Sequence, residues 1–75
     1  MENLAKLLSE VLRIPAAEIE DKTSMEELDS WDSLRHMEII QTIEQSYEIE
    51  LTADEIVQMT NVGGIKEVLI SKNLL

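Results

Sequence analysis

The sequence contains no cysteine, and this absence excludes several classes of function together. Without a thiol there is no disulfide, no thiolate metal site and no cysteine nucleophile. The chain has 75 residues, and at this size folding removes only about 60% of the unfolded chain's accessible surface from water. Such a thin core leaves no room for a buried enzyme active site with supporting residues around it. We therefore expect a single small domain, residues 1–75, stabilised by its apolar core alone.

Basic side chains are also scarce: six lysines and arginines stand against sixteen aspartates and glutamates, which gives a formal net charge of −10. This balance argues against binding to nucleic acid or to an anionic membrane surface and favours a basic partner protein. The longest apolar run, Val68–Ile70, is far shorter than the roughly 20 residues that span a membrane. Met1–Asn3 begins neither a basic nor an apolar segment, so no signal peptide is visible. We expect a monomer in the cytoplasm.

Apolar residues recur at three- and four-residue steps in four segments, a pattern typical of helices with one buried face. The first segment covers about residues 2–13 and ends before the only proline, because a proline pushes the preceding residue out of helical geometry. An irregular stretch of about residues 14–32 follows. The second helix begins at Asp32 or Ser33, either of which is a natural cap, and continues through Tyr47.

Two shorter helices are predicted after it. Thr52–Glu55 has the Ser/Thr-x-x-Glu form of a capping box, and Asn61 is placed to cap the last helix. Gly63 and Gly64 weaken the first turn of that helix by roughly 1 kcal/mol each relative to alanine, so we expect close backbone packing there as the compensation. No strand pattern is long enough to form a sheet. The sequence predicts an all-α four-helix bundle, three main helices plus one short helix with a long first loop, and a fraying tail at residues 72–75.

The sharpest local feature lies where the long loop meets the second helix, in the segment Leu28–Leu34 (Leu-Asp-Ser-Trp-Asp-Ser-Leu). The first N–H groups of a helix have no intrahelical partners, and the helix dipole favours negative charge beside them. A phosphate ester on Ser33 would be stabilised by these groups. The same residues are also typical of a plain helix cap made by Asp32 and Ser33, and the physical argument alone leaves both interpretations open.

In its placement, the Asp-Ser-Leu motif of residues 32–34 resembles the attachment site of the acyl carrier proteins and related peptidyl carrier domains. The resemblance covers essentially the whole chain, from the first helix through the long loop to the last helix. It implies that a phosphopantetheinyl transferase uses coenzyme A and Mg²⁺ to attach 4′-phosphopantetheine to Ser33. The implied cofactor-binding residues are Ser33 and its two neighbours, Asp32 and Leu34.

The resemblance also implies how such a protein works. The terminal thiol of the arm would hold an acyl, malonyl, aminoacyl or polyketide group as a thioester. The implied partners are the transferase, an acyl-loading ligase or transferase, and enzymes of the synthase or ketosynthase type. The protein would contribute no catalytic residue, because the cofactor supplies the thiol that the chain lacks. The competing interpretation is an acidic helical adaptor that binds a basic partner and carries no prosthetic group.

Two serines follow an aspartate in this segment, and they are not equivalent. Only Ser33 is followed by leucine and leads directly into the second helix, so we assign the arm to Ser33 and a loop or capping role to Ser30. Asp32 either caps the helix or helps the transferase to dock and to orient the hydroxyl, and the two roles can coexist.

A partner-docking surface on and near the second helix is a further implication of the resemblance. Met37 either packs in the core or forms an adaptable contact surface, and Glu38 and Glu44 either meet basic patches on partners or face solvent. Arg35 stands where fatty-acid carriers usually have an acidic residue, and two glutamines dilute the charge of the helix. These departures favour a specialised pathway over an ordinary fatty acid synthase. The candidate docking residues are Arg35, Met37, Glu38, Gln41, Glu44, Asp54 and Glu55.

Trp31 and His36 flank the motif, and each has alternative roles. Trp31 either folds over the loop as a hydrophobic clamp, lines the path of the acyl group or contacts a partner. His36, the only histidine, is either a general base in the modification or an ordinary polar helix residue. The acidic residues lack the spacing of a calcium loop, and no ligand set indicates a zinc site, so we expect no resident metal.

Overall fold

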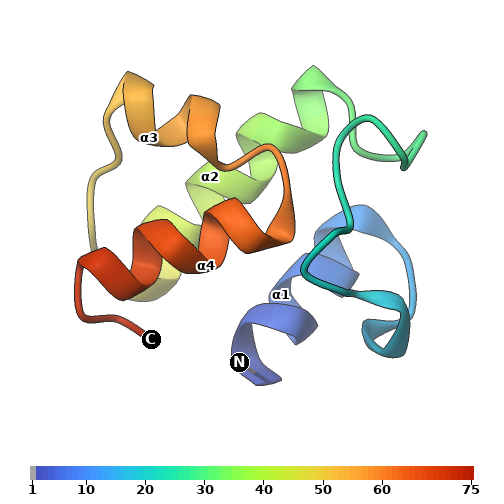
Figure 1. The fold of residues 1–75 in the computed structure, drawn as a ribbon, viewed down its shortest axis with the longest axis horizontal. Helices are drawn as coiled ribbons and strands as arrows, with labels where there is room; N and C mark the ends of the chain where they lie inside the picture. Colours follow the sequence, from blue (N-terminus) through green and yellow to red (C-terminus); the bar gives the residue numbers. More distant parts are fainter. Residues whose placement is uncertain (1) are drawn as a thin grey trace.

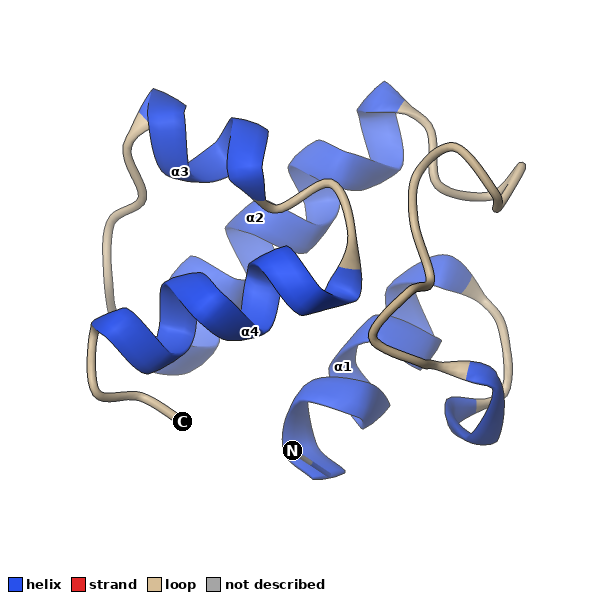
Figure 2. Ribbon diagram, viewed as in Figure 1, coloured by secondary structure: helices blue, strands red, loops and turns tan. Residues whose placement is uncertain are grey.

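The structure, a computed structural model, describes residues 2–75. Over this range the chain forms α1 (Glu2–Leu12), the short 3₁₀ helix η1 (Ala16–Glu18), α2 (Ser33–Tyr47), α3 (Ala53–Gln58) and α4 (Val62–Ser71), as Figure 1 shows. The rest of the described chain is loop and turn, with no β-strand (Figure 2). The predicted all-α fold, with a long first loop and a short third helix, is therefore confirmed.

The boundaries of the first helix differ slightly from the prediction. The helix ends at Leu12, because Arg13 adopts a left-handed backbone conformation with φ of 60°. The N–H of Ile14 then donates to the carbonyl of Ser9 at 3.2 Å, which closes the helix end. η1, which begins right after Pro15, was not predicted, because three residues are too few to show a helical period.

The core is built from one face of each long helix. α1 packs against α2 and η1, while α3 packs against α4. α3 itself contains no buried residue. The long loop supplies one large buried side chain, the indole of Trp31. The buried apolar residues are Leu4, Leu8, Leu12, Trp31, Ile39, Ile40, Ile43, Met59, Val62, Ile65, Val68 and Leu69.

The loop between α1 and α2 runs along the right-hand side of the view in Figure 1 and is fastened to the turn between α3 and α4. The N–H of Met25 donates to the carbonyl of Thr60 at 2.9 Å, and the N–H of Val62 donates to the carbonyl of Thr23 at the same distance. These backbone bonds hold a segment that has no secondary structure period of its own, and they fix the approach to α2.

The start of α4 shows why two consecutive glycines are tolerated there. The side-chain oxygen of Asn61 accepts a hydrogen bond from the N–H of Gly64 at 2.6 Å, as the predicted cap requires. A Cβ atom on Gly64 would overlap the backbone carbonyl of Gln58 at the end of α3, and one on Gly63 would lie 3.3 Å from the carbonyl oxygen of Asp21. The predicted close packing of backbone is confirmed, and Gly64 is the tighter of the two positions.

The tail is more ordered than the sequence predicts. The N–H of Leu74 donates to the carbonyl of Leu69 at 2.9 Å, and Asn73 has a left-handed φ of 61°, which is a common way to close a helix. Lys72 forms an ion pair with Glu55 at 2.8 Å. The expectation of fraying is therefore wrong for residues 72–74. In the part of the chain that the structure describes, no helix has the length and apolar character needed to cross a membrane.

Candidate functional site

The candidate attachment residue occupies the first position of α2. Asp32 is the N-cap, with an extended backbone, and its Oδ1 accepts from the N–H of Arg35 at 2.9 Å. The carbonyl of Asp32 accepts the first intrahelical bond, from the N–H of His36 at 2.8 Å. The N–H groups of Ser33 and Leu34 precede that bond and lie at the positive end of the helix dipole. The site therefore offers N–H donors where a phosphate on Ser33 would lie.

Exposure separates the two candidate serines. The side chain of Ser33 is exposed, whereas Ser30 is half-buried in the preceding turn. Leu34 is also 71% exposed beside Ser33. A hydroxyl that lies in solvent at the start of a fifteen-residue helix is accessible to an enzyme that must transfer a group to it. The chemistry of this position fits the attachment of a phosphodiester-linked arm.

Trp31 and His36 lie below the surface on either side of Ser33. The indole of Trp31 is 1% exposed and belongs to the core, so it is not available for surface contact with a partner. Its Nε1–H donates to Nδ1 of His36 at 3.1 Å, and Nε2 of His36 lies 2.9 Å from the carbonyl oxygen of Ile56 in α3.

His36 is therefore not an ordinary polar helix residue, because the residue is only 7% exposed and its ring is bonded on both nitrogens. A general base in the modification would need its ring nitrogen directed at the serine hydroxyl, and here both nitrogens have other partners. No sequence pattern could have signalled this arrangement, because its two partners lie five and twenty residues away.

The candidate docking residues on α2 differ in how they are engaged. Arg35 and Glu38 form an ion pair with each other at 2.9 Å. Met37 is 48% exposed, and Gln41 is also exposed. Glu44 is half-buried, and its Oε2 accepts from the N–H of Leu51 at 2.9 Å, which ties α2 to the following loop.

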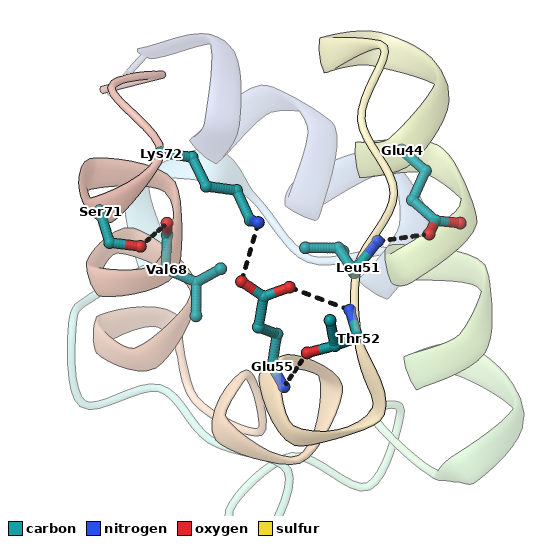
Figure 3. A network of polar contacts seen from close by, with 7 residues as sticks. All are labelled: Glu44, Leu51, Thr52, Glu55, Val68, Ser71 and Lys72. Carbon is teal, nitrogen blue, oxygen red and sulfur yellow. Dashed lines mark hydrogen bonds and ion pairs between the residues drawn. The ribbon is translucent and has the colours of Figure 1, made fainter.

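α3 packs on the core through the partly buried Ile56 and is also tied down by polar contacts, with Glu55 at their centre (Figure 3). Thr52 Oγ1 accepts from the N–H of Glu55 at 3.2 Å, and Glu55 Oε1 accepts from the N–H of Thr52 at 2.9 Å, so the predicted capping box is confirmed. Lys72 reaches across from the end of α4 to the same carboxylate. The hydrogen bond from Lys72, together with the backbone bond from Thr52, lowers the pKa of the Glu55 carboxyl below 4.5. By contrast, Asp54 is exposed.

One exposed apolar residue was not singled out from the sequence. Val57 on α3 is 71% exposed, and it follows Ile56, whose carbonyl contacts His36. The sequence placed Val57 among the apolar residues of a short helix, and a six-residue helix is too short for its period to distinguish the buried face from the exposed one. Leu34 and Met37 on α2 and Val57 on α3 are thus large apolar side chains in solvent near the start of α2 and the end of α3.

Two further features lie away from this end of the molecule. A surface groove of about 450 Å³ between α1 and α2 is lined by residues that include Lys6, Glu10, Thr42 and Tyr47. Thr42 lies nine residues beyond Ser33, or about 13 Å along the helix axis, so this groove does not adjoin the serine. Among residues 2–75, no cluster of three or more histidine, aspartate or glutamate side chains is placed to hold a metal ion.

Comparison with known proteins agrees with the site. The family described as "Phosphopantetheine attachment site" matches residues 2–69. The chain is 38% identical over 72 residues to "Polyketide-8 synthase acyl carrier protein 2" of Streptomyces avermitilis, covering 95% of this chain and 82% of that protein. It is 36% identical over 70 residues to "Non-reducing polyketide synthase pkbA" of Emericella nidulans, covering 93% of this chain but only 3% of that protein. The resemblance to carrier proteins is thereby confirmed, and the chain belongs to the phosphopantetheine-attachment family, whose prosthetic group is 4′-phosphopantetheine.

Proposed function

We propose that this protein is an acyl carrier protein that bears its 4′-phosphopantetheine arm on Ser33 and serves a polyketide-type pathway as a cytoplasmic monomer. The observation that carries the assignment is the exposed hydroxyl of Ser33 at the start of α2, within an Asp-Ser-Leu motif, in a chain that matches the family over residues 2–69. The names of the two relatives support the choice of a polyketide pathway over others.

The chemistry of attachment follows from the position of Ser33. Its Oγ forms a bond to the phosphorus that carries the pantetheine of coenzyme A, the bond from that phosphorus to the bridging oxygen breaks, and 3′,5′-ADP leaves. The hydroxyl proton passes to a base of the transferase, because neither nitrogen of His36 is free to take it. The N–H groups at the start of α2 stabilise the phosphodiester that results. Once attached, the arm supplies a thiol on which acyl groups are held as thioesters.

The role of the folded chain in this scheme is recognition. The exposed apolar side chains Leu34 and Met37 on α2 and Val57 on α3 provide contact area for partners, and the same helices carry exposed polar groups such as Gln41 and Asp54. A net charge of −10 attracts partners with basic surfaces and raises the rate of encounter. The partners that we propose are a phosphopantetheinyl transferase, an acyl-loading ligase or transferase, and enzymes of the synthase or ketosynthase type.

The assignment is tested by intact-mass measurement after incubation of the protein with coenzyme A, Mg²⁺ and a broad-specificity phosphopantetheinyl transferase. We expect a gain of one phosphopantetheine group that is absent in Ser33→Ala and retained in Ser30→Ala, the matched control three residues away. Retention of the gain in Ser33→Ala would assign the arm elsewhere. No gain in the wild-type protein would favour an acidic adaptor without a prosthetic group.

A further inference from the structure

A continuous path of hydrogen bonds, one buried and one partly buried, runs from the loop before Ser33, through α2, to α3. Trp31 Nε1 lies 3.1 Å from His36 Nδ1, and His36 Nε2 lies 2.9 Å from the carbonyl oxygen of Ile56. The two ring centroids are 6.1 Å apart with an interplanar angle of 33°. We refer to this set of three residues as the Trp31–His36–Ile56 clamp. Nothing in the attachment chemistry uses it.

The two outer partners of the clamp fix the protonation of the ring between them. An indole N–H can only donate, and a carbonyl oxygen can only accept. His36 Nδ1 must therefore carry a lone pair, and Nε2 must carry the hydrogen. Only the neutral imidazole with its proton on Nε2 satisfies both bonds. His36 is a buried residue, so loss of either bond would leave a polar atom of the clamp without its partner, which is costly.

The clamp encloses the attachment residue in sequence and links it to α3 in space. Trp31 lies two residues before Ser33 and His36 lies three residues after it, so their buried bond joins the residue before the cap of α2 to the first turn of the helix. At the other end, the carbonyl of Ile56 also accepts from the N–H of Met59 at 3.2 Å, at the point where α3 ends. α3 has six residues and no buried side chain, so a direct bond from α2 matters more for its position than it would for a well-buried helix.

Exposed apolar residues adjoin both ends of this link. Met37 follows His36 on α2, and Val57 follows Ile56 on α3. The bond between His36 and Ile56 therefore sets the spacing between the exposed apolar residue of α2 that follows His36 and the one of α3 that follows Ile56. A partner that contacts both helices meets them already in place and does not have to order them as it binds.

We propose that His36 is a positioning residue: in its Nε2–H form it holds the Ser33 end of α2 and the end of α3 together as one preformed docking surface for the phosphopantetheinyl transferase. This inference rests on the proposed function. It places the effect in binding rather than in group transfer, because no atom of the clamp touches the hydroxyl that reacts. Loss of one clamp bond should raise KM by about 2- to 12-fold, with kcat within about two-fold of wild type.

Two substitutions of His36 remove one bond each. In His36→Asn the amide oxygen lies where Nδ1 was, so the acceptor for Trp31 is kept and the donor to Ile56 is lost. In His36→Gln the amide nitrogen reaches the position of Nε2, so the donor to Ile56 is kept and the acceptor for Trp31 is lost. Val68→Ala is the matched control, since it removes buried packing in α4 without touching the clamp.

The experiment measures kcat and KM of a phosphopantetheinyl transferase with each full-length apo protein as substrate. We expect a raised KM in both His36 variants, an unchanged kcat, and an unchanged KM in Val68→Ala. If KM is unchanged in the His36 variants, or if Val68→Ala raises it equally, the inference is overturned while the proposed function stands. If the wild-type protein is not modified at all, both are overturned.

A spectroscopic measurement on the wild-type protein tests the clamp without any substitution. The chain has one tryptophan and one histidine, so each gives a single set of side-chain NMR signals. We expect ring ¹⁵N shifts that place the hydrogen of His36 on Nε2 at neutral pH, and an indole N–H of Trp31 that exchanges slowly with solvent. A hydrogen on Nδ1, or rapid exchange of the indole N–H, would overturn the inference.

Discussion

Asp32 combines a structural role with a candidate binding role, and two substitutions separate them. Its Oδ1 accepts from the N–H of Arg35 at 2.9 Å and caps α2, while the carboxylate as a whole is exposed beside Ser33. Asp32→Asn keeps an acceptor oxygen at the cap and removes the charge. Asp32→Ala removes both. The difference in stability between the two variants therefore measures the contribution of the cap. The rate at which the transferase modifies Asp32→Asn measures the contribution of the charge.

The two roles of Asp32 predict effects of different size. Loss of a side-chain cap costs about 1 kcal/mol of unfolding free energy, which corresponds to about 4–8 °C in melting temperature for a domain of this size. Asparagine caps nearly as well as aspartate, so Asp32→Asn should lose only about 0.3 kcal/mol, the lower end for an exposed charge near a helix N-terminus. If the carboxylate accepts a charge-assisted bond from the transferase, its loss lowers kcat/KM about 10-fold or more.

Thermal unfolding followed by circular dichroism gives the first quantity, and transferase kinetics on the same samples give the second. We expect Asp32→Asn to melt close to wild type and to be modified about 10-fold more slowly. If Asp32→Asn melts as low as Asp32→Ala, the capping argument is wrong, because asparagine keeps an oxygen that can accept from the N–H of Arg35 and alanine does not. If Asp32→Asn is modified at the wild-type rate, the charge has no role with the transferase and capping accounts for the residue.

Two further predictions concern the position of α3. Gly64→Ala should melt about 4 °C or more below Gly63→Ala, because overpacking against the backbone of Gln58 costs about 1–3 kcal/mol. The gain in helix propensity is the same at both positions. Equal melting temperatures of the two variants would contradict the close approach of Gly64 to Gln58. The Glu55 carboxyl has a pKa below its ordinary value of 4.5 because of its ion pair with Lys72, so the pair stabilises the fold above that ordinary value and is lost as the pH falls through the lower folded pKa. Lys72→Met should therefore melt below wild type at neutral pH, and the gap should narrow as the pH falls below 4.5 and through the lowered pKa of Glu55. A gap that stays the same in acid would show that the ion pair is not its source.

The sequence predicts those features of the fold that arise within four residues of one another. The capping box of Thr52–Glu55, the cap at Asn61 and the cap at Asp32 are each a hydrogen bond between positions three residues apart. Their geometry follows from helix formation alone, which is why composition and spacing were enough to place them. The start of α2, and with it the place of Ser33 in the first turn, belongs to this class.

The sequence predicts the close packing at Gly63 and Gly64, but it does not reveal the other contacts between segments distant in the chain. The bond from His36 to the carbonyl of Ile56 spans twenty residues. The ion pair from Lys72 to Glu55 joins the end of one helix to the start of another. A lone histidine in a helical stripe carries no periodic signal that distinguishes a solvated ring from a buried one, so its role depends on packing that only the folded chain defines.

The same distinction changes how the charge of −10 bears on partner recognition. A net charge counts every carboxylate equally, but in the fold some of these carboxylates already have partners within the chain. Glu44 and Glu55 accept hydrogen bonds within the chain, and Glu38 is paired with Arg35. Because these groups already have partners, a docking enzyme must compete for them or rely on exposed groups such as Asp54. Leu34, Met37 and Val57 are large apolar side chains exposed on α2 and α3. We therefore propose that net charge governs the approach of partners, while apolar contact with these two helices determines how tightly they bind.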